Sequence, residues 1–429
     1  MKYLPIENKL FTLNRKNFVS RTKPNSISIF NANDEFPKNG DQAFPFKQNA
    51  DFFYLTGIDQ EQSILILYPD CPNPLYKEVL FLRQTDEHIA VWEGHKYTRE
   101  EARAASGIQN IYWLQEFDAI LHSIINYAEN IYINTNENDR YVHTVPYRDA
   151  RMLEQLRRKY PLHNYERAAV ILRDLRAVKS DLEVQLTRKA CEITRDGFIR
   201  VLKFVKPGVA EYEVEAETSH EFLRQRATGH AYNPIIASGA SANVLHYIEN
   251  NKICKDGDVL LLDFGAEYAN YNADMTRSIP VNGRFSQRQR DVYDAVLRVM
   301  RGAIGLIKAG SIMNEYQDEV GKMMTSELIG LKLLDKSAVE KQDPKMPLYK
   351  KYFMHGTSHH LGLDVHDFAS RYKPFEAGNI LTCEPGIYIP EEGLGIRLEN
   401  NILITAEGNT DLMWDIPVEA EEIEEIMNS

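Results

Sequence analysis

This sequence is poor in cysteine and has no long apolar run near its beginning. Its 429 residues include four cysteines, none of them in a CxxC pair: Cys71, Cys191, Cys254 and Cys383. Their scarcity and spacing exclude an obvious zinc–thiolate site and fit a reducing compartment. The first 18 residues are interrupted by charged side chains, which excludes the apolar core of a signal peptide or a membrane span. We therefore expect a soluble protein of the cytoplasm.

The chain also has no excess of positive charge. With 50 Lys and Arg against 62 Asp and Glu, its formal net charge is −12 at pH 7. Such a chain is a poor match for nucleic acids and for anionic membranes, and it weakly attracts substrates that carry a free amine. Hydrophobic residues make up 43% of the sequence and charged residues 26%, which is ordinary for a globular protein. The length favours two domains.

The first part of the chain alternates short apolar runs with helical stretches, a pattern typical of an α/β domain. The expected strands are 63–68, 79–82 and 131–133, and the expected helices are 99–106 and 147–160. A capping box, Ser180-Asp-Leu-Glu183, then opens a new helix. We place the domain boundary just before it. This gives an α/β N-terminal domain of residues 1–174 and a second domain of residues 175–429.

The second domain shows one order of elements twice, without an obvious sequence repeat. In each half, two expected helices are followed by strands. The helices are 180–206 and 211–228 in the first half and 286–308 and 312–331 in the second; the main strands are 259–264 and those within 380–405. Two such halves facing one another would form a sheet with helices on its outer side. We therefore expect an α+β domain.

The first half contains a hairpin that can bring two aspartates together. Asp263 ends one apolar strand and Asp274 begins another. A turn centred between Tyr268 and Ala269 would place the two aspartates opposite each other. Directly opposed residues of an antiparallel pair have Cβ atoms about 4.5–5.5 Å apart. A shift of register or a bulge would change this pairing.

The second half contains a similar hairpin with two glutamates. It turns at Pro390-Glu-Glu-Gly393, whose midpoint is also the midpoint between Glu384 and Glu399. Alternation places Tyr388 and Arg397 on the face of the two glutamates. The opposite face is apolar and comprises Ile387, Ile389, Ile396 and Leu398. The polar face could be the floor of a site or a solvated sheet face. Two such hairpins, each after a helix pair, favour the site.

Four carboxylates in one place repel each other and would take up protons unless cations neutralise them. Oxygen-rich ligation favours divalent ions such as manganese, and one imidazole would complete the site. The segment 355–367, HGTSHHLGLDVHD, offers four histidines. Its glycine and hydroxyl residues disfavour a helix. We expect an extended segment with His355 and His359 on one face and His360 and His366 on the other.

Together these segments resemble one known family, the pita-bread metallopeptidases. The matching motifs are Asp263, Asp274-Met-Thr-Arg277, the histidine segment 355–367, Glu384-Pro-Gly386 and Arg397-Leu-Glu399. Within the family they are most similar to aminopeptidase P and prolidase, which act at Xaa-Pro bonds. The resemblance covers most of the chain, since Phe44–Gly57 is similar to the N-terminal domain of aminopeptidase P. It implies a pita-bread catalytic domain of two pseudo-symmetric halves after an α/β domain of the creatinase/aminopeptidase P type.

The resemblance implies a site with two divalent metal ions, and the oxygen-rich ligands favour manganese. Five residues would be metal ligands by their place in the motifs: Asp263, Asp274, His359, Glu384 and Glu399. Asp274 and Glu399 would bridge the ions. His366 would line the active site and bind the substrate, with His355 and His246 close to it. His360 has no role in the family pattern, so we expect it to be structural or at the surface.

The chemistry of such a site predicts a mechanism. Two metal ions about 3.5–4 Å apart can bridge a water and supply a hydroxide at neutral pH. The hydroxide would attack the scissile carbonyl while His366 and His246 stabilise the oxyanion. Glu384 would move protons to the leaving nitrogen. Arg397 would orient the carboxylates and, with Tyr388, face the substrate. By resemblance, the reaction is release of the N-terminal residue from peptides with proline second.

Other functions stay open from the sequence. Prolidase, which cleaves only the Xaa-Pro dipeptide, differs from aminopeptidase P in contacts of the N-terminal domain. Methionine aminopeptidase shares the metal pattern but usually lacks such a domain. Pita-bread domains without the acidic ligands serve other chemistry, as in creatinase, or binding alone, whereas all five positions are filled here. We expect peptide substrates, a homodimer or homotetramer, and no nucleic-acid or membrane partner.

Overall fold

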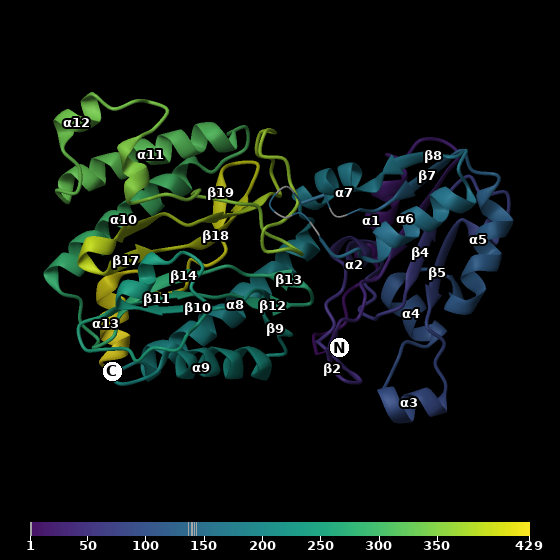
Figure 1. The fold of residues 1–429 in the computed structure, drawn as a ribbon, viewed down its shortest axis with the longest axis horizontal. Coiled ribbons are helices and arrows are strands. Elements are labelled where there is room, and N and C mark those ends of the chain that lie inside the picture. Colours follow the sequence, from purple (N-terminus) through teal and green to yellow (C-terminus); the bar gives the residue numbers. More distant parts are fainter. Residues whose placement is uncertain (1, 136, 139, 141, 143) are drawn as a thin grey trace. The chain divides into compact units, whose positions relative to one another are not determined.

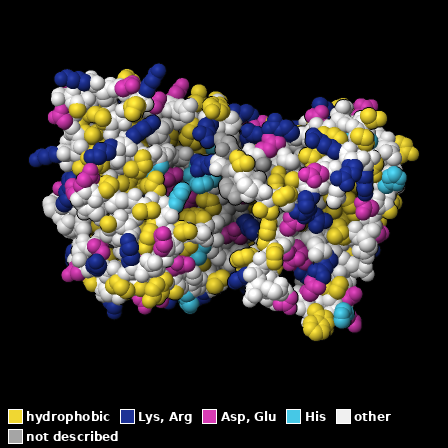
Figure 2. All heavy atoms as spheres, in the orientation of Figure 1, with side chains coloured by type: hydrophobic (Ala, Val, Ile, Leu, Met, Phe, Trp, Pro, Cys, Tyr) yellow, Lys and Arg dark blue, Asp and Glu magenta, His cyan; other side chains and the backbone are white. Residues whose placement is uncertain are grey.

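The computed structural model describes residues 2–135, 137–138, 140, 142 and 144–429. They divide into an N-terminal unit, Tyr3–Arg176, and a C-terminal unit, Ala177–Ser429, both drawn in Figure 1. Figure 2 shows acidic and basic side chains interspersed over the visible surface of each unit. Within the described part of the chain, no helix has both the length and the apolar character needed to cross a bilayer.

The N-terminal unit is built on a mixed sheet, because its apolar runs are rich in Ile, Val, Leu and Phe and are buried on both faces. The strands are β1 (Ser26–Asn31), β4 (Ile64–Leu67), β5 (Glu78–Leu82), β6 (Asn110–Trp113), β7 (Asn130–Ile133) and β8 (Asn164–Arg167), beside a separate pair, β2 (Pro37–Asn39) and β3 (Gln42–Ala43). The order is β6-β5-β4-β1-β7-β8. β4 is antiparallel to β1 and β5, and the other neighbours are parallel.

Helices pack on both faces of this sheet. The helices of the unit are α1 (Lys9–Val19), α2 (Ala50–Thr56), α3 (Glu87–Glu93), α4 (Arg99–Ser106), α5 (Phe117–Ile125), α6 (Arg148–Lys159) and α7 (Ala168–Ala177), and α3 has no buried residue. Ile27 and Ile29 share one apolar cluster with α5 residues such as Leu121. On the other face, the ring of Phe30 meets that of Phe18 from α1 edge-on, with centroids 5.2 Å apart. The expected α/β character of this part of the chain is confirmed.

The C-terminal unit shows the order helix, helix, strands twice, as predicted. Its helices are α8 (Asp181–Phe204), α9 (Glu211–Arg224), α10 (Gln287–Leu306), α11 (Met313–Gly330), α12 (Lys336–Glu340) and α13 (Ala420–Met427). The α8 helix begins at the predicted capping box, where Glu183 accepts the backbone N–H of Ser180 at 2.9 Å. The α8 helix packs against α9, and α10 packs against α11. In Figure 1 the strands lie between the two helix pairs.

The strands of the C-terminal unit form several small sheets. They are β9 (Gly229–His230), β10 (Ile235–Ser238), β11 (Val259–Asp263), β12 (Ala266–Tyr268), β13 (Tyr271–Asn272), β14 (Thr276–Pro280), β15 (Ile380–Cys383), β16 (Gly386–Ile389), β17 (Leu394–Arg397), β18 (Asn400–Ile404) and β19 (Asn409–Asp411). β11 lies between β10 and β14, and β18 lies between β15 and β19. β16 pairs with β17, and β12 lies between β13 and β9.

The first hairpin has a different register from the predicted one. Asp263 pairs with Thr276, not with Asp274, so the prediction was wrong by two residues. The turn falls at Ala269 and Asn270, whose φ angles of 53° and 65° are those that tight hairpin turns require. Because side chains alternate with a period of two, this shift keeps both aspartates on the same face of the hairpin.

The second hairpin has the predicted register. Gly386 pairs with Arg397 and Tyr388 with Gly395. The face predicted to be polar is buried, since Tyr388 is 0% and Arg397 is 4% exposed. The alternative of a solvated sheet face is therefore wrong for this hairpin. Its polar side chains lie inside the unit, where they need partners.

Candidate functional site

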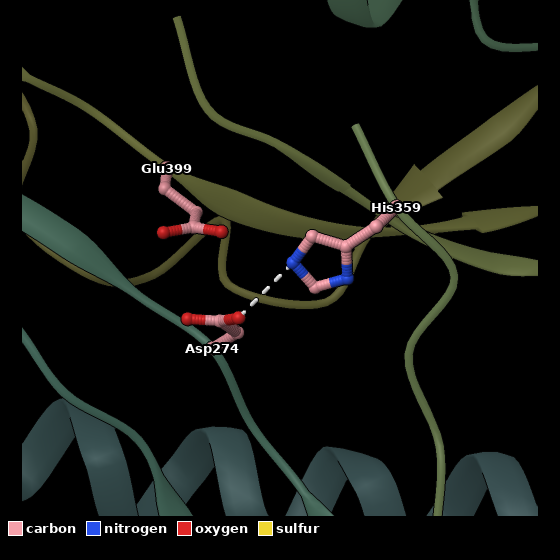
Figure 3. A group of neighbouring side chains, drawn as sticks. All are labelled: Asp274, His359 and Glu399. Atoms are coloured by element: carbon pink, nitrogen blue, oxygen red, sulfur yellow. Dashed lines mark ion pairs between the residues drawn. The ribbon is translucent and has the colours of Figure 1, made fainter. Parts of the chain in front are cut away.

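Three of the predicted ligands meet in the C-terminal unit. Asp274 lies just before β14, Glu399 lies between β17 and β18, and His359 lies before β15. Their ligand atoms all lie within 4.8 Å of one another. Figure 3 shows the three side chains pointing toward one another, with His359 Nε2 3.3 Å from Asp274 Oδ2. All three are buried. Two carboxylates and one imidazole at this spacing can hold a divalent cation.

Asp263 joins this group through Tyr232. The Tyr232 hydroxyl lies 2.6 Å from Asp263 Oδ1 and 2.6 Å from Asp274 Oδ1. A hydroxyl has one proton, so it can donate to only one of the two carboxylates. Two buried carboxylates this close to one hydroxyl therefore need a further proton or a cation. This donor set fits a metal site.

Glu384 approaches the same ring nitrogen of His359 as Asp274 does. Its Oε1 is 3.6 Å from His359 Nε2, and its Oε2 is 3.7 Å from Nδ1 of His355. The Glu384 side chain is 19% exposed, against 7% for that of Asp274, so it is the more open of these two carboxylates. The structure thus brings all five predicted ligands together, and their role as ligands stays a prediction.

Burial and mutual repulsion disfavour the ionised carboxylates. Burial raises the pKa of Asp263, raises that of Glu384 to about 7, and raises that of Glu399 well above its usual value. The charge of Asp274 adds to the rise in all three pKa values. Burial alone would lower the pKa of His359, but its bond to Asp274 and the charge of Glu384 raise it. Bound cations would neutralise the negative charge and so favour the ionised carboxylates.

The histidine segment is irregular rather than extended, apart from one bridge between His360 and Leu381. The predicted division of its side chains between two faces was therefore wrong. The rings of His359 and His366 lie edge to face, with centroids 4.4 Å apart. Nδ1 of His359 lies 2.9 Å from the carbonyl oxygen of His360. A proton on Nδ1 would satisfy that oxygen and leave Nε2 free to bind a metal.

Arg397, Tyr388 and His355 form a chain of hydrogen bonds that reaches Asp263. Arg397 donates through Nη2 to Asp263 Oδ2 at 2.5 Å and through Nη1 to the Tyr388 hydroxyl at 2.8 Å. The hydroxyl lies 2.8 Å from His355 Nε2. Burial and Arg397 lower the pKa of His355 to about 3, so it is neutral at pH 7. This chain holds Asp263 in place; substrate contact by Arg397, Tyr388 or His355 stays a prediction.

The remaining predicted histidines differ in their surroundings. His246 and His366 are exposed, and Figure 2 shows histidine side chains grouped on one part of the C-terminal unit's visible surface. His246 lies close enough to His355 for its charge to contribute to the low pKa of His355, after burial and Arg397. His360 is buried against the ring of Phe375, as expected of a structural residue.

Comparison with known proteins identifies the family. Residues 185–406 match metallopeptidase family M24, and residues 11–132 match the aminopeptidase P N-terminal domain. The chain is 34% identical to a Xaa-Pro aminopeptidase of Haemophilus influenzae over 100% of this chain and 99% of the relative. This chain belongs to metallopeptidase family M24.

Solved structures of aminopeptidase P have the same fold as this M24 chain. Escherichia coli aminopeptidase P with the inhibitor Pro-Leu aligns with a TM-score of 0.88 and 31% identity, over 99% of each chain. Aminopeptidase PepP of Pseudomonas aeruginosa aligns with a TM-score of 0.89 and 30% identity, over 99% of this chain and 98% of the other. The pita-bread fold is confirmed, and the chain is a hydrolase of the metallo-exopeptidase class.

Sequence reasoning missed two residues of this M24 site. Tyr232 precedes β10 and carries no motif that sets it apart from the chain's 23 tyrosines. Thr276 lies within the Asp274-Met-Thr-Arg277 motif, but only the structure shows its role. Its hydroxyl donates to Glu399 Oε2 at 2.7 Å and accepts from Arg397 Nε at 3.1 Å. Both hydroxyls orient carboxylates of the site.

Replacing Tyr232 with phenylalanine is expected to weaken metal binding about 10- to 100-fold, because the hydroxyl that orients Asp263 and Asp274 is lost. Manganese titration of the metal-free variant measures this. Tyr212→Phe is the matched control, since Tyr212 is 59% exposed on α9. Equal affinity of the Tyr232 variant and the parent would contradict the assigned role.

Proposed function

We propose that this M24 enzyme releases the N-terminal residue from peptides that have proline in the second position. Full-length similarity to a Xaa-Pro aminopeptidase supports this reaction. The Pro-Leu inhibitor in the Escherichia coli aminopeptidase P structure supports a proline after the cleaved bond. One observation carries the proposal: five potential ligands form one cluster, namely Asp263, Asp274, His359, Glu384 and Glu399.

We infer that these five residues hold two divalent ions, with manganese as the proposed metal. Asp274 and Glu399 would be shared between the ions. Four carboxylates and one imidazole are ligands that suit manganese better than thiolate-seeking metals. When bound, such ions lower the pKa of water and polarise a carbonyl oxygen.

The chain's own side chains would do the rest of the chemistry. His366 and His246 are exposed and can donate hydrogen bonds to the oxygen of the scissile carbonyl. Glu384 is open enough to take a proton from water and pass it to the leaving nitrogen. Arg397 and Tyr388 would keep Asp263 oriented through their buried hydrogen bonds.

The substrate is proposed to be held by its free amine near the acidic cluster, in keeping with the net charge of −12. We further propose that residues 1–174 and 175–429 act as the N-terminal and catalytic domains. A cytoplasmic location, a homodimer or homotetramer, and the absence of nucleic-acid and membrane partners stay predictions.

The test compares a Gly-Pro-Leu tripeptide with a Gly-Pro dipeptide, using metal-stripped enzyme with and without added manganese. We expect manganese-dependent release of glycine from the tripeptide, because water activation needs the metal. Liquid chromatography of free glycine measures the rate. Asp263→Asn serves as the inactive reference.

The possible results separate the alternatives. Cleavage of the dipeptide alone would identify a prolidase instead. A tripeptide Gly-Ala-Leu cleaved as fast as Gly-Pro-Leu would contradict selection for proline. Manganese-independent cleavage would contradict the role of the five ligands.

A further inference from the structure

Lys179 and Asp367 form a buried ion pair outside the proposed metal site. Lys179 Nζ donates to Asp367 Oδ2 at 2.8 Å, and each side chain is only 1% exposed. Lys179 directly precedes the capping box at Ser180 that begins α8. Asp367 directly follows His366. The pair therefore ties the start of a long helix to the loop that carries His366.

Further contacts show that this loop is shaped around the ion pair. The backbone N–H of Asp367 donates to the carbonyl oxygen of His360 at 2.8 Å, which closes the loop 360–367. A Cβ on Gly362 would lie 2.3 Å from Asp367 Oδ2 and 2.9 Å from Lys179 Cε. The loop can thus approach the ion pair closely only because residue 362 is glycine.

The loop is also attached to the strands that carry the predicted ligands. Asn272 donates to the carbonyl oxygen of Gly362 through its backbone N–H at 3.0 Å and through Nδ2 at 2.9 Å. Asn272 lies two residues before Asp274. At the end of the loop, the ring of His366 lies edge to face with that of His359 at 4.4 Å.

Stability alone does not account for a lysine at this position. A positive charge next to a helix N-terminus opposes the helix dipole. Removing two charges from water costs several kcal/mol per ion, and an apolar pair of similar volume is often equally stable. An ion pair differs from an apolar pair in that its geometry is specific. The charge-assisted hydrogen bond at 2.8 Å fixes the position of Asp367.

We propose that the Lys179–Asp367 ion pair is a positioning device for His366. It holds the loop so that the exposed imidazole stands next to His359 and meets the substrate in one orientation. This inference rests on the proposed function, in which His366 contacts the substrate. Small displacements of a group that contacts the reacting atoms lower rates strongly, which explains why an exposed side chain is attached to a buried pair.

A double-mutant cycle with Asp367→Asn and His366→Ala tests the proposal in manganese-loaded enzyme cleaving Gly-Pro-Leu. Asp367→Asn is expected to lower kcat about 10- to 100-fold and to leave manganese affinity within about threefold of the parent. His366→Ala is expected to cost about 100-fold in the parent but no more than about tenfold in the Asp367→Asn background, so that the double variant is about as slow as His366→Ala alone. Multiplicative losses would overturn the proposal, because a general structural defect does not depend on His366.

A second variant guards against misfolding of the first. Lys179→Met with Asp367→Leu replaces the ion pair by an apolar pair and is expected to keep the melting temperature while kcat stays at least about tenfold low. Full kcat in this variant would overturn the proposal. Lys322→Met is the control, since Lys322 is 71% exposed and pairs with Glu319 on α11.

Hydrogen exchange separates this inference from the proposed function. In the manganese-loaded protein, Asp367→Asn is expected to speed exchange of the loop amides 360–367 but not of β11 and β14. If the parent cleaves no Xaa-Pro peptide, the proposed function fails. Faster exchange confined to the loop would still show that the Lys179–Asp367 ion pair holds the loop in place. An unchanged exchange rate in the loop would overturn the inference that the ion pair holds the loop.

Discussion

Replacing Glu399 with glutamine is expected to lower kcat/KM by about 1,000-fold or more on Gly-Pro-Leu, because metal binding contributes several kcal/mol to the transition state. Glu399 is 2% exposed, and Thr276 Oγ1 donates to its Oε2 at 2.7 Å. Glutamine keeps the size of the side chain and removes the charge that a cation needs. Steady-state kinetics and the manganese content per chain measure the two effects.

The same substitution is expected to leave the metal-free protein at least as stable as the parent. Burial and the charges of Asp274 and Glu384 raise the pKa of Glu399 well above its usual value, so its ionised form is unfavourable in the fold. Glutamine removes that cost. Thermal melting in chelator measures this, and Glu407→Gln at the surface is the control. A variant that melts far below the parent without metal would show that Glu399 stabilises the fold by itself.

Without metal, the protein is expected to lose stability as pH rises from about 4 to 8. In the metal-free protein, the pKa values of Asp263, Glu384 and Glu399 are raised in the fold. Stability from these carboxyls is therefore fully present only below their ordinary pKa values of 3.8 and 4.5, and it is lost as pH rises through the raised values of the folded protein. The pKa of Glu384 rises from 4.5 to about 7, which corresponds to a loss on the order of 3 kcal/mol between pH 4 and pH 8. The raised pKa of His359 acts in the same direction.

Manganese is expected to stabilise more as pH rises, because its ligands must be deprotonated to bind. Melting temperatures from pH 5 to pH 8, with chelator and with saturating manganese, measure both trends. The gap between the two curves should widen with pH. A metal-free protein whose stability rises from pH 5 to pH 8 would contradict the buried, cation-dependent cluster. Asp274→Asn should flatten the manganese effect.

The sequence-based prediction of a hairpin was accurate where the chain carries a clear turn sequence and inaccurate where it does not. The second hairpin had its turn residues at 390–393, and its predicted register was correct because the turn fixes the pairing. The first hairpin had no such turn sequence. Its turn falls at Ala269 and Asn270 with positive φ angles, and only Asn270 is of a residue type that favours such an angle. The error was two residues, an even number, so the prediction that Asp263 and Asp274 share a face survived.

The conformation of the histidine segment depends on contacts with distant parts of the chain. Alternation along an extended strand separates His359 from His366, but the loop 360–367 bends back and brings their rings to 4.4 Å. Gly362, Asn272 and the Lys179–Asp367 pair cause this bend, and they come from three distant parts of the chain. The side-chain periods of strands and helices, two and 3.6 residues, give no information about contacts between distant parts of the chain.

Residue types and their order along the chain were enough to predict the main features of this protein: acidic and imidazole side chains in ordered motifs, two similar halves, and a catalytic unit after an α/β unit. These features depend on residue type and on periods of a few residues. The hydroxyls, charges and backbone groups that surround each predicted ligand depend on contacts between distant parts of the folded chain. Tyr232 meets Asp263 and Asp274, Thr276 meets Glu399, and Lys179 meets Asp367. These partners lie 31 to 188 residues apart, and they meet because folding buries polar groups that must then find one another.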